Sequence, residues 1–565
     1  MENNKILEVK GLKKYFPIKK DMFGRPLVNL RAVDDVTFEL AAGKTIGVVG
    51  ESGCGKTTLG RTILQLYDTT GGKTLYYGHK VEELLPQYYV KGIKSLPTYK
   101  RKYNNLKAKL EILAKELNNY NELVNSELTI KSYKNLLLNV ESDIKNLSEE
   151  EKDYKNKLDN LVQHLNQIIT VLDEASSTTG GAILSNVNVG STLYLKKINK
   201  ENEYYKVCNK RNELNKKLSS NCSNEEKVNY QALINNIEDE INLIISELNK
   251  INEELNDFKK EINKTPLFLE LESNLESGLN LAKLTKPEMR KLRTEIQLIF
   301  QDPYSSLPPR MTIGQILTEP VQVHKIVEKD KISEHVHKVM KMCGLQPQYY
   351  DRYPHEFSGG QRQRICIARA LVVNPKLVIC DEPVSALDVS IQAQIINLLK
   401  ELQNNLGLTY MFISHDLSVV KYITDSIIVM YLGNMMEIGD TKDIFQNPLH
   451  PYTQALFSAV PVPDPDAKMN RIILKGDIPS PANPPKGCKF HTRCEKCMGV
   501  CKLKTPKFIQ YDENHLVACH LYDNEVMANL EKYDLELEEI EKKEQEKLQA
   551  LEAKKNQKAN KEEVK

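Results

Sequence analysis

The chain has 565 residues, with 78 Lys or Arg against 76 Asp or Glu, so its formal net charge at pH 7 is only +2. This length excludes a single small domain, and the balanced charge lacks the basic excess of nucleic-acid-binding proteins, so no nucleic-acid partner is expected. No segment has the roughly 18 to 20 apolar residues that span a bilayer, and the first residues lack the apolar region of a secretory signal, so a cytoplasmic protein is expected.

Residues 1–85 are predicted to form a compact lobe of short strands that ends in a nucleotide-binding loop. Apolar runs at residues 6–9, 32–40 and 44–49 are typical of strands. The next segment, Gly50–Thr57, has the sequence of a Walker A loop and precedes a helix-forming run, which is the context that such a loop requires.

The chemistry of a Walker A loop depends on its glycines and on two side chains. Glycines let the backbone N–H groups close on phosphate oxygens. Lys56 is expected to pair with the β- and γ-phosphates, and the Thr57 hydroxyl is expected to reach Mg²⁺.

Residues 86–286 are rich in Asn, Lys, Leu and Glu and are predicted to form a separate insert. Apolar residues recur there at alternating spacings of three and four, the pattern of a coiled coil. The two sets are Leu137, Val140, Ile144, Leu147, Tyr154, Leu158, Leu161, Leu165, Ile168 and Leu172, and Tyr230, Ile234, Ile237, Ile241, Ile244, Leu248, Ile251, Leu255, Phe258 and Ile262. A poor helix-forming stretch at 176–192 separates them, so an antiparallel helical hairpin that turns there is predicted. Both a tolerated surface expansion and a partner-binding arm fit this pattern.

Residues 287–450 alternate between helical and buried-strand patterns, which indicates an α/β unit. The apolar strand at 377–380 ends in two carboxylates. Asp381 can hold Mg²⁺ through water, and Glu382 can polarise an attacking water molecule.

The segment Phe357–Gln361 precedes a helix, so its backbone amides and the Ser358 hydroxyl can hold a γ-phosphate at a positive helix end. The chain's own phosphates are expected on Gly50–Thr57. The phosphate at Ser358 must therefore come from another subunit.

Residues 451–522 form a predicted C-terminal region that begins with a Pro-rich stretch and contains a cluster of cysteines, and residues 523–565 form a charged tail. Four thiolates suit either a [4Fe-4S] cluster or Zn²⁺, and the spacing does not choose between them. The four expected ligands are Cys488, Cys494, Cys501 and Cys519. Cys497 is an additional thiol that forms a local C-x2-C with Cys494, so the sequence leaves open which four of the five bind.

Six motifs occur in the order found in ABC-type ATPases, which the chain therefore resembles. They are Gly50–Thr57, Gln301 within Phe300–Pro303, Phe357–Gln361, Asp381–Glu382, Asp388 within Ser385–Asp388, and His415 within Ile413–Asp416. Further segments resemble the F-type ATPase subunit of oligopeptide and dipeptide importers. These are Lys14–Phe38, Gly50–Arg61, Ile299–Pro320, Asp381–Ile391 and Asn447–Thr453.

This resemblance implies an ABC-type P-loop ATPase fold. A RecA-like α/β core would carry antiparallel β and helical subdomains, be interrupted by the coiled-coil hairpin, and be followed by a small cysteine-rich domain. The implied activity is ATP hydrolysis coupled to peptide import, with ATP and Mg²⁺ as cofactors. The four-cysteine pattern of the same family implies a [4Fe-4S] cluster, with Zn²⁺ as the alternative.

The resemblance also assigns roles to individual residues. The implied ATP-binding residues are Phe16, Gly50, Ser52, Gly53, Cys54, Gly55, Lys56, Thr57 and Thr58. The implied Mg²⁺ residues are Thr57, Gln301 and Asp381, and the implied catalytic residues are Glu382 as the base, His415 as the γ-phosphate contact and Gln301 as the sensor. Asp388 would form the D-loop, and Ser358, Gly359, Gly360 and Gln361 would complete a partner's site.

The implied partners are a related D-type ATPase subunit in a heterodimer, two membrane permease subunits and, indirectly, an extracellular peptide-binding protein. The implied location is peripheral, at the cytoplasmic face of the cell membrane. The alternative is a chromosome-organising or repair ATPase, which also joins an ABC head to a coiled coil. In that class the coil separates the Q-loop from the signature, whereas here the insert precedes Gln301.

Overall fold

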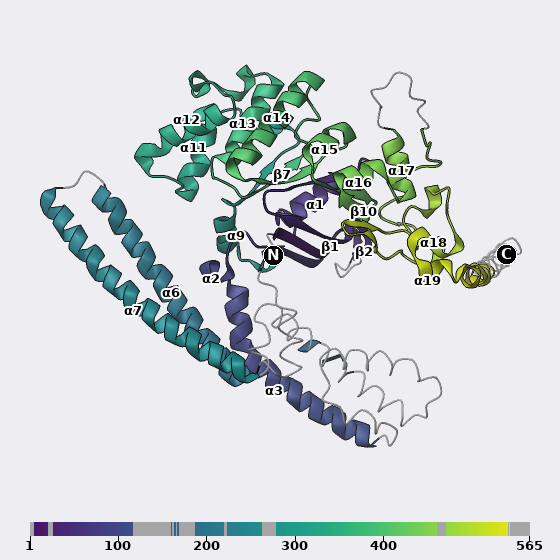
Figure 1. The fold of residues 1–565 in the computed structure, drawn as a ribbon, viewed down its shortest axis with the longest axis horizontal. Coiled ribbons are helices and arrows are strands. Elements are labelled where there is room, and N and C mark those ends of the chain that lie inside the picture. The colour runs from purple at the N-terminus through teal and green to yellow at the C-terminus, as the bar shows by residue number, and fades with distance from the viewer. Residues whose placement is uncertain are drawn as a thin grey trace, which may run out of the picture. The chain divides into compact units, whose positions relative to one another are not determined.

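The computed structural model describes residues 5–20, 26–116, 187–219, 223–262, 278–459 and 471–540, with the isolated residues 160, 163, 164, 167, 168 and 542. The chain divides into two compact units (Figure 1). The first contains residues 1–78, 280–282 and 289–565, and the second contains residues 79–279 and 283–288. Among the described residues, no helix combines the length and the apolar character that crossing a bilayer requires.

An eight-stranded sheet forms the centre of the first unit, in the order β11-β12-β10-β9-β3-β8-β7-β6. Its strands are β3 (Thr45–Val49), β6 (Ile296–Ile299), β7 (Leu377–Asp381), β8 (Thr409–Ile413), β9 (Ser426–Tyr431), β10 (Asn434–Asp440), β11 (Ile509–Asp512) and β12 (His515–Val517). The neighbouring strands β6, β7, β8, β3 and β9 pair in parallel. Strands β10, β12 and β11 extend the sheet beyond β9 with antiparallel pairing. Strands β3, β7 and β8 are buried at every position, as expected for parallel strands covered on both faces.

The strand predicted at 377–380 is thus confirmed as β7 (Leu377–Asp381). Because parallel strands end at the same edge of a sheet, the end of β3 and the end of β7 bring the Walker A loop and the two carboxylates together.

A second sheet has the order β2-β1-β4-β5. It consists of β1 (Lys5–Lys20), β2 (Pro26–Ala41), β4 (Gly71–Tyr76) and β5 (Leu279–Asn280). Helix α1 (Lys56–Ile63) contacts strands of both sheets and begins where the Walker A loop ends.

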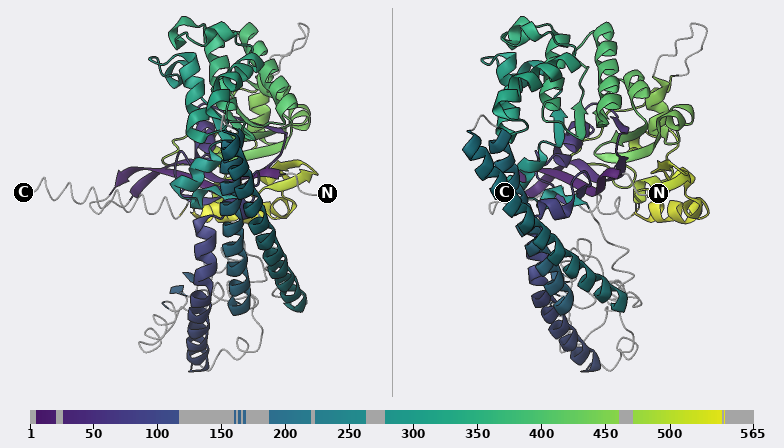
Figure 2. Two further views of the ribbon diagram at one scale, coloured as in Figure 1. Left: turned by 90° about the vertical axis from the view of Figure 1, so that its left-hand side faces the viewer. Right: turned by 60° about the vertical axis from the view of Figure 1, so that its left-hand side comes forward.

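The helices α11 to α13 and the C-terminal helices α18 and α19 lie at opposite ends of the first unit (Figure 2). The α-helices outside the insert, besides α1, are α9 (Lys286–Leu292), α10 (Pro303–Ser306), α11 (Ile313–His324), α12 (Ile332–Met342), α13 (Gly359–Leu371), α14 (Val389–Leu406), α15 (Leu417–Ile423), α16 (Thr441–Gln446), α17 (Pro451–Ser458), α18 (Gly499–Leu503) and α19 (Asn524–Met527). Short 3-10 turns are η1 (Leu281–Lys283), η2 (Lys329–Lys331), η3 (Pro347–Tyr349), η4 (Pro354–Glu356), η5 (His491–Arg493) and η6 (His520–Tyr522). Of the predicted charged tail, residues 530–540 are helical.

The second unit is helical. Its helices are α2 (Val81–Leu84), α3 (Gln87–Glu116), α6 (Val187–Ser219) and α7 (Asn224–Ile262). Helices α6 and α7 run side by side (Figure 1) and antiparallel, because Phe258 near the end of α7 packs on Leu193 near the start of α6. Val207 in α6 packs on Ile241 and Ile244 in α7. All ten predicted seam residues of α7 are buried or half-buried.

The predicted turn of the hairpin is wrong at residues 187–192, which form the first turns of α6. The hydroxyl groups of Ser191 and Thr192 donate to carbonyl oxygens four residues earlier, and Val187 is buried in a cluster with Ile93 and Leu96 of α3. Burial therefore overrides the weak helix propensity of this stretch. The partner of α7 is α6, and the other predicted set, Leu137 to Leu172, lies outside the described residues except for Ile168.

Candidate active site

Three glycines with left-handed backbone angles shape the loop between β3 and α1. Their φ values are 150° at Gly50, 79° at Gly53 and 103° at Gly55. An added Cβ would lie 2.2 Å from the carbonyl oxygen of Met430 at Gly50, and 2.0 Å from that of Ala32 at Gly55. Only glycine fits at these two positions. Helix α1 begins here with no side-chain cap and no acidic residue in its first turn, so its free N–H groups favour an anion.

Lys56 lies inside this loop and is only 5% exposed. Its Nζ donates hydrogen bonds to the carbonyl oxygens of Gly50 at 2.9 Å and Glu51 at 3.0 Å, and it lies 3.8 Å from the sulfur of buried Cys54. Gly50 and Cys54 were both predicted to bind phosphate, but here they shape the loop around Lys56 and do not line the pocket in front of it.

Thr57 and Asp381 meet at the start of α1. The Thr57 hydroxyl donates a 2.7 Å hydrogen bond to Oδ1 of Asp381. Asp381 is 1% exposed, and burial, as the largest cause, raises the pKa of its carboxyl. Its Oδ2 has no hydrogen-bond partner among the described residues, and the nearest cation is the Arg61 guanidinium at 3.7 Å. A buried carboxylate oxygen without a donor beside a hydroxyl suits the oxygen-coordinated Mg²⁺ of a bound nucleotide.

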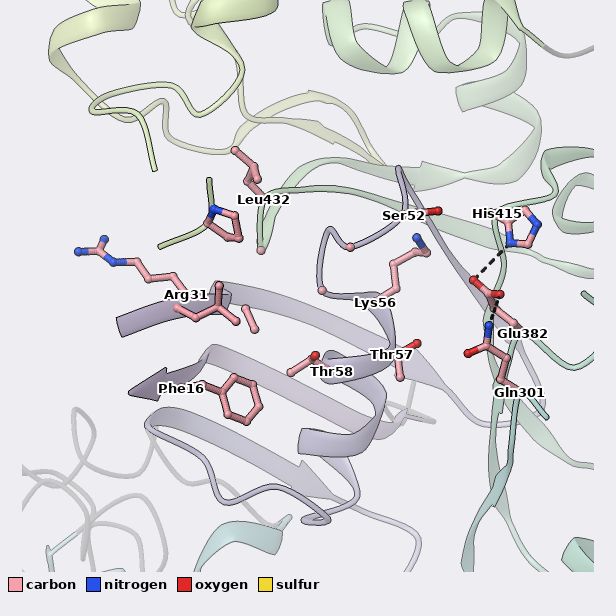
Figure 3. Close-up of a pocket in the computed structure, with 16 residues that line it drawn as sticks. Phe16, Arg31, Ser52, Lys56, Thr57, Thr58, Gln301, Glu382, His415 and Leu432 are labelled. Carbon is pink, nitrogen blue, oxygen red and sulfur yellow. Dashed lines mark hydrogen bonds and ion pairs between the residues drawn. The ribbon is translucent and has the colours of Figure 1, made fainter. Parts of the chain in front are cut away.

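The carboxylate of Glu382 is held from both sides (Figure 3). Gln301 Nε2 donates a 2.8 Å hydrogen bond to Oε2, and Nδ1 of His415 lies 3.3 Å from Oε1. The backbone of Glu382 has a φ of 46°, which is uncommon outside glycine. Its side chain is 15% exposed, whereas the His415 side chain is 54% exposed. A carboxylate fixed in this way can accept a proton from water.

These groups face a single pocket of about 430 Å³ (Figure 3). Its lining residues are Phe16, Leu30, Arg31, Ala32, Ser52, Gly53, Gly55, Lys56, Thr57, Thr58, Gln301, Glu382, His415, Leu432, Gly433 and Pro481. The structure thus brings together most of the predicted ATP-binding residues and all three predicted catalytic residues.

Phe16, Arg31 and Leu432 lie at the end of the pocket away from Glu382 (Figure 3). Phe16 lines the pocket, whereas the hydroxyl of the neighbouring Tyr15 is hydrogen-bonded to Asp34. Lys14 lies over the Phe16 ring with its Nζ 4.8 Å from the ring centroid, and Tyr67 meets Phe16 edge-on. Of the two neighbouring rings of Tyr15 and Phe16, that of Phe16 is therefore the one that lines the pocket.

Six lining residues were not predicted from the sequence: Leu30, Arg31, Ala32, Leu432, Gly433 and Pro481. They belong to none of the six ordered motifs, although Leu30, Arg31 and Ala32 lie within the segment Lys14–Phe38. Gly433 N–H donates to the Cys54 carbonyl at 2.9 Å, and Arg31 N–H donates to the Pro481 carbonyl at 3.2 Å, so contacts between distant segments bring them here. The Pro-rich stretch that contains Pro481 was the only sequence signal for this segment.

The signature segment lies outside this pocket. Ser358 caps α13: its hydroxyl accepts from the Gln361 N–H at 3.4 Å, and the Gln361 side chain accepts from the Ser358 N–H at 3.1 Å, which is a capping box. A Cβ at Gly360 would lie 2.4 Å from Ile391 of α14, and one at Gly359 would lie 3.3 Å from Leu387. The start of α13 is therefore packed against the predicted D-loop.

Asp388 of that D-loop caps α14 and does not line the pocket. Its carboxylate accepts from the Ser390 hydroxyl at 2.7 Å and from the Ile391 N–H at 3.0 Å, and these bonds lower its pKa.

The cysteine-rich region is continuous with the first unit. Strand β12 pairs with β10 and so extends the central sheet. The pair is reinforced by buried His515, whose Nε2 lies 2.7 Å from buried Glu437. Cys488, Phe490 and Cys501 belong to the same hydrophobic cluster as the strands of the central sheet.

The four predicted cysteine ligands lie near one another. Burial is the largest cause that raises the pKa of their thiols, to about 12 at Cys488 and about 11 at Cys501 and Cys519, and their mutual proximity raises it further. Cys494 contributes to this effect at all three. Raised pKa values favour the protonated thiols, so a metal bound here would have to displace their protons. In the described part of the chain, no group of three or more His, Cys, Asp or Glu side chains is arranged to hold a metal ion.

Two protein families match this chain. The family described as "ABC transporter" matches residues 33–185 and 264–385, and the family described as "Oligopeptide/dipeptide transporter, C-terminal region" matches residues 436–501. The interval between the two parts of the first match contains α6 and α7.

Three curated relatives have related names. The oligopeptide transport ATP-binding protein AppF of Bacillus subtilis is 35% identical over 519 residues, which cover 92% of this chain and 97% of that protein. The putative oligopeptide transport ATP-binding protein YkfD of Bacillus subtilis is 52% identical over 44% of this chain and 76% of its own length. The oligopeptide transport ATP-binding protein OppF of Haemophilus influenzae is 52% identical over 43% of this chain and 74% of its own length.

Proposed function

Because the chain belongs to the ATP-binding proteins of the oligopeptide and dipeptide ABC transporter family, we propose that it hydrolyses ATP to power the import of oligopeptides or dipeptides. The observation that carries this proposal is the Glu382 carboxylate, held by Gln301 and His415 at the wall of a pocket that also contains Lys56 and Thr57.

The proposed mechanism assigns one task to each group. Lys56 and the N–H groups at the start of α1 bind the phosphates of MgATP, and Thr57 with Asp381 holds its Mg²⁺. Glu382 accepts a proton from the attacking water, while Gln301 and His415 keep its carboxylate in place. The proton transfer and the phosphate contacts meet in one pocket, as hydrolysis requires.

The chain is proposed to be the F-type ATPase subunit, as the names of AppF and OppF suggest. We further propose that it pairs with a related D-type subunit. It would work at the cytoplasmic face of the membrane on two permease subunits, to which an extracellular binding protein delivers peptide. The alternative of a chromosome-organising or repair ATPase is not favoured, because the helices α6 and α7 precede Gln301 and only α10, α11, α12 and short turns lie between Gln301 and Ser358.

Peptide uptake tests this function directly. Cells that lack the chain should take up a labelled tripeptide or pentapeptide only after the intact chain is restored, and a Lys56→Ala chain should not restore uptake, because it loses the phosphate contact. Uptake of free amino acids is the control. Normal peptide uptake without the chain, or with Lys56→Ala, would contradict the proposal.

The same assay addresses the proposed coiled-coil insert, of which α6 and α7 form the described hairpin. A chain in which residues 86–277 are replaced by a Gly/Ser linker, which keeps β5 (Leu279–Asn280), should still restore uptake, because the pocket residues all lie outside this range. Loss of uptake with a normally folded ATPase would instead give the insert an essential role in transport.

We also propose that Cys488, Cys494, Cys501 and Cys519 bind a [4Fe-4S] cluster within a small C-terminal domain. Support comes from the mutual proximity of these four thiols, with Cys497 beside Cys494 and Cys501. When bound, such a cluster would supply thiolate–iron bonds that cross-link this region.

Anaerobically purified protein should then be brown, with broad absorption near about 400 nm from thiolate-to-iron charge transfer, and Cys519→Ser should abolish this absorption. Cys343→Ser, which changes a buried cysteine of the first unit far from this group in sequence, is the control. Colourless protein with one equivalent of zinc would decide for the alternative metal.

A further inference from the structure

Glu51, the second residue of the Walker A loop, is held at three of its atoms. Its N–H donates a 2.8 Å hydrogen bond to the hydroxyl of Tyr452, and its carbonyl oxygen accepts from Lys56 at 3.0 Å. Its carboxylate pairs with the guanidinium of Arg493, with Nη1 2.8 Å from Oε2. The first and third contacts come from the C-terminal part of the chain, more than four hundred residues after Glu51 in sequence.

Arg493 is firmly placed for this contact. It ends the turn η5 (His491–Arg493), directly before Cys494. Its side chain is 8% exposed and that of Glu51 is 24% exposed, so the pair is largely withdrawn from solvent. Arg493 also reaches the hydroxyl of Tyr431 at 3.5 Å. Partly buried ion pairs with direct hydrogen bonds are stronger than exposed ones and restrict both partners.

An aromatic cluster joins the same region to the sheet beneath the loop. The ring of Phe490 lies 5.3 Å from the ring of Tyr431 on β9 and 5.3 Å from that of Tyr452 on α17. Tyr431 and Tyr452 are themselves 4.8 Å apart. Because Phe490, Tyr431 and Tyr452 are all fully buried, the support of Arg493 is rigid.

The C-terminal part of the chain also supplies a wall of the pocket. Pro481 is one of its lining residues, and the Pro481 carbonyl accepts from the N–H of Arg31 at 3.2 Å. The C-terminal part of the chain therefore contributes Pro481 to the pocket wall and Arg493 to the loop beside it.

We propose that Arg493 is a positioning residue for nucleotide binding, which holds the Walker A loop in its phosphate-binding shape through Glu51. Arg493 does not line the pocket. It acts on the loop whose carbonyl oxygens, at Gly50 and Glu51, orient Lys56. This inference rests on the proposed function, because it takes the pocket to be the MgATP site.

The Walker A loop contacts the phosphates before and during hydrolysis alike, so a less ordered loop weakens substrate binding and transition-state binding together. Such a change raises Kd and KM and leaves kcat nearly unchanged. This pattern separates Arg493 from the groups around Glu382, whose loss lowers kcat.

The test measures MgATP affinity of the full-length chain with a fluorescent ATP analogue, and steady-state ATPase activity in the assembled complex. Arg493→Gln is expected to weaken MgATP binding about tenfold, the size of a lost hydrogen bond to a charged group, with kcat at saturating ATP within about twofold of the native value. Arg493→Lys keeps the charge and should recover part of the affinity. Lys475→Gln, which removes an exposed partner of Glu495 at 4.0 Å in the same region, should change neither value.

The decisive comparison repeats Arg493→Gln in a Glu51→Gln background. If Arg493 acts through Glu51, its replacement there should change the affinity by less than about twofold. A full tenfold effect in that background, or no effect in the native background, overturns the inference. If Arg493→Gln fails to fold, the single variant Glu51→Gln removes the same ion pair through its other partner. In that case, a native MgATP affinity in both single variants, Arg493→Lys and Glu51→Gln, would overturn the inference. If the native chain binds no MgATP, the proposed function fails instead.

Discussion

Glu382→Gln is expected to lower the rate of ATP hydrolysis at this chain's own nucleotide site in the assembled transporter by about 10² to 10⁴, because an amide cannot accept the proton that the attacking water gives up. Gln has the shape of Glu, and its side-chain oxygen can still accept the hydrogen bond that Gln301 now donates at 2.8 Å. Neither Lys56 nor the Thr57–Asp381 pair touches Glu382 through a hydrogen bond. The MgATP Kd of this variant should therefore stay within about threefold of the native value.

Two further variants make this prediction specific. Lys56→Ala should lose MgATP binding, because the buried ammonium at the loop is its phosphate contact. Glu401→Gln removes an exposed carboxylate on α14 and should change neither binding nor turnover. Near-normal turnover of Glu382→Gln would show that another group is the base.

The sequence predicts well the edge of the central sheet where the Walker A loop and the two carboxylates meet, because the sequence signals for these strands and motifs are local. Each of the strands β3 and β7 is a short apolar run that ends at its motif. The order of the motifs then brings Lys56 and Glu382 into one pocket without knowledge of the loops between them. Local strand patterns and glycine requirements are sufficient for this part of the site.

The rest of the pocket depends on contacts between segments that have no common pattern. Pro481 and Arg31 are joined by one backbone hydrogen bond across 450 positions of sequence, and Arg493 meets Glu51 across 442. Nothing in the composition of either partner indicates the other. The long hairpin of β1 and β2 is similar: residues 17–20 have no apolar alternation and are strand because residues 26–29 pair with them.

The second large effect is expected at the signature segment, where Ser358→Asp should lower ATP hydrolysis about 10² to 10³-fold at the partner subunit's site, which this segment is proposed to complete. Asp is as good a helix cap as Ser, so α13 should keep its start. However, a carboxylate at this position would repel a γ-phosphate that the helix start is proposed to bind, and loss of such a donor typically costs this much.

The matched variant is Ser358→Asn, which caps the helix equally well and adds no charge. Its loss of turnover should be at least about tenfold smaller than that of Ser358→Asp, if charge at the phosphate is the cause. Both variants should fold with native helix content by circular dichroism.

MgATP binding by the isolated chain tests whether the γ-phosphate at Ser358 belongs to this chain's own nucleotide or to the partner subunit's. Ser358, Gly359, Gly360 and Gln361 do not line the chain's own pocket, and the start of α13 packs instead on Leu387 and Ile391. Ser358→Asp should therefore leave the MgATP Kd of the isolated chain unchanged while it blocks hydrolysis at the partner subunit's site in the two-subunit assembly. If the isolated variant already binds MgATP more weakly, Ser358 acts on its own chain's nucleotide and the composite site is wrong. If the assembly hydrolyses ATP normally, the signature makes no contact with phosphate.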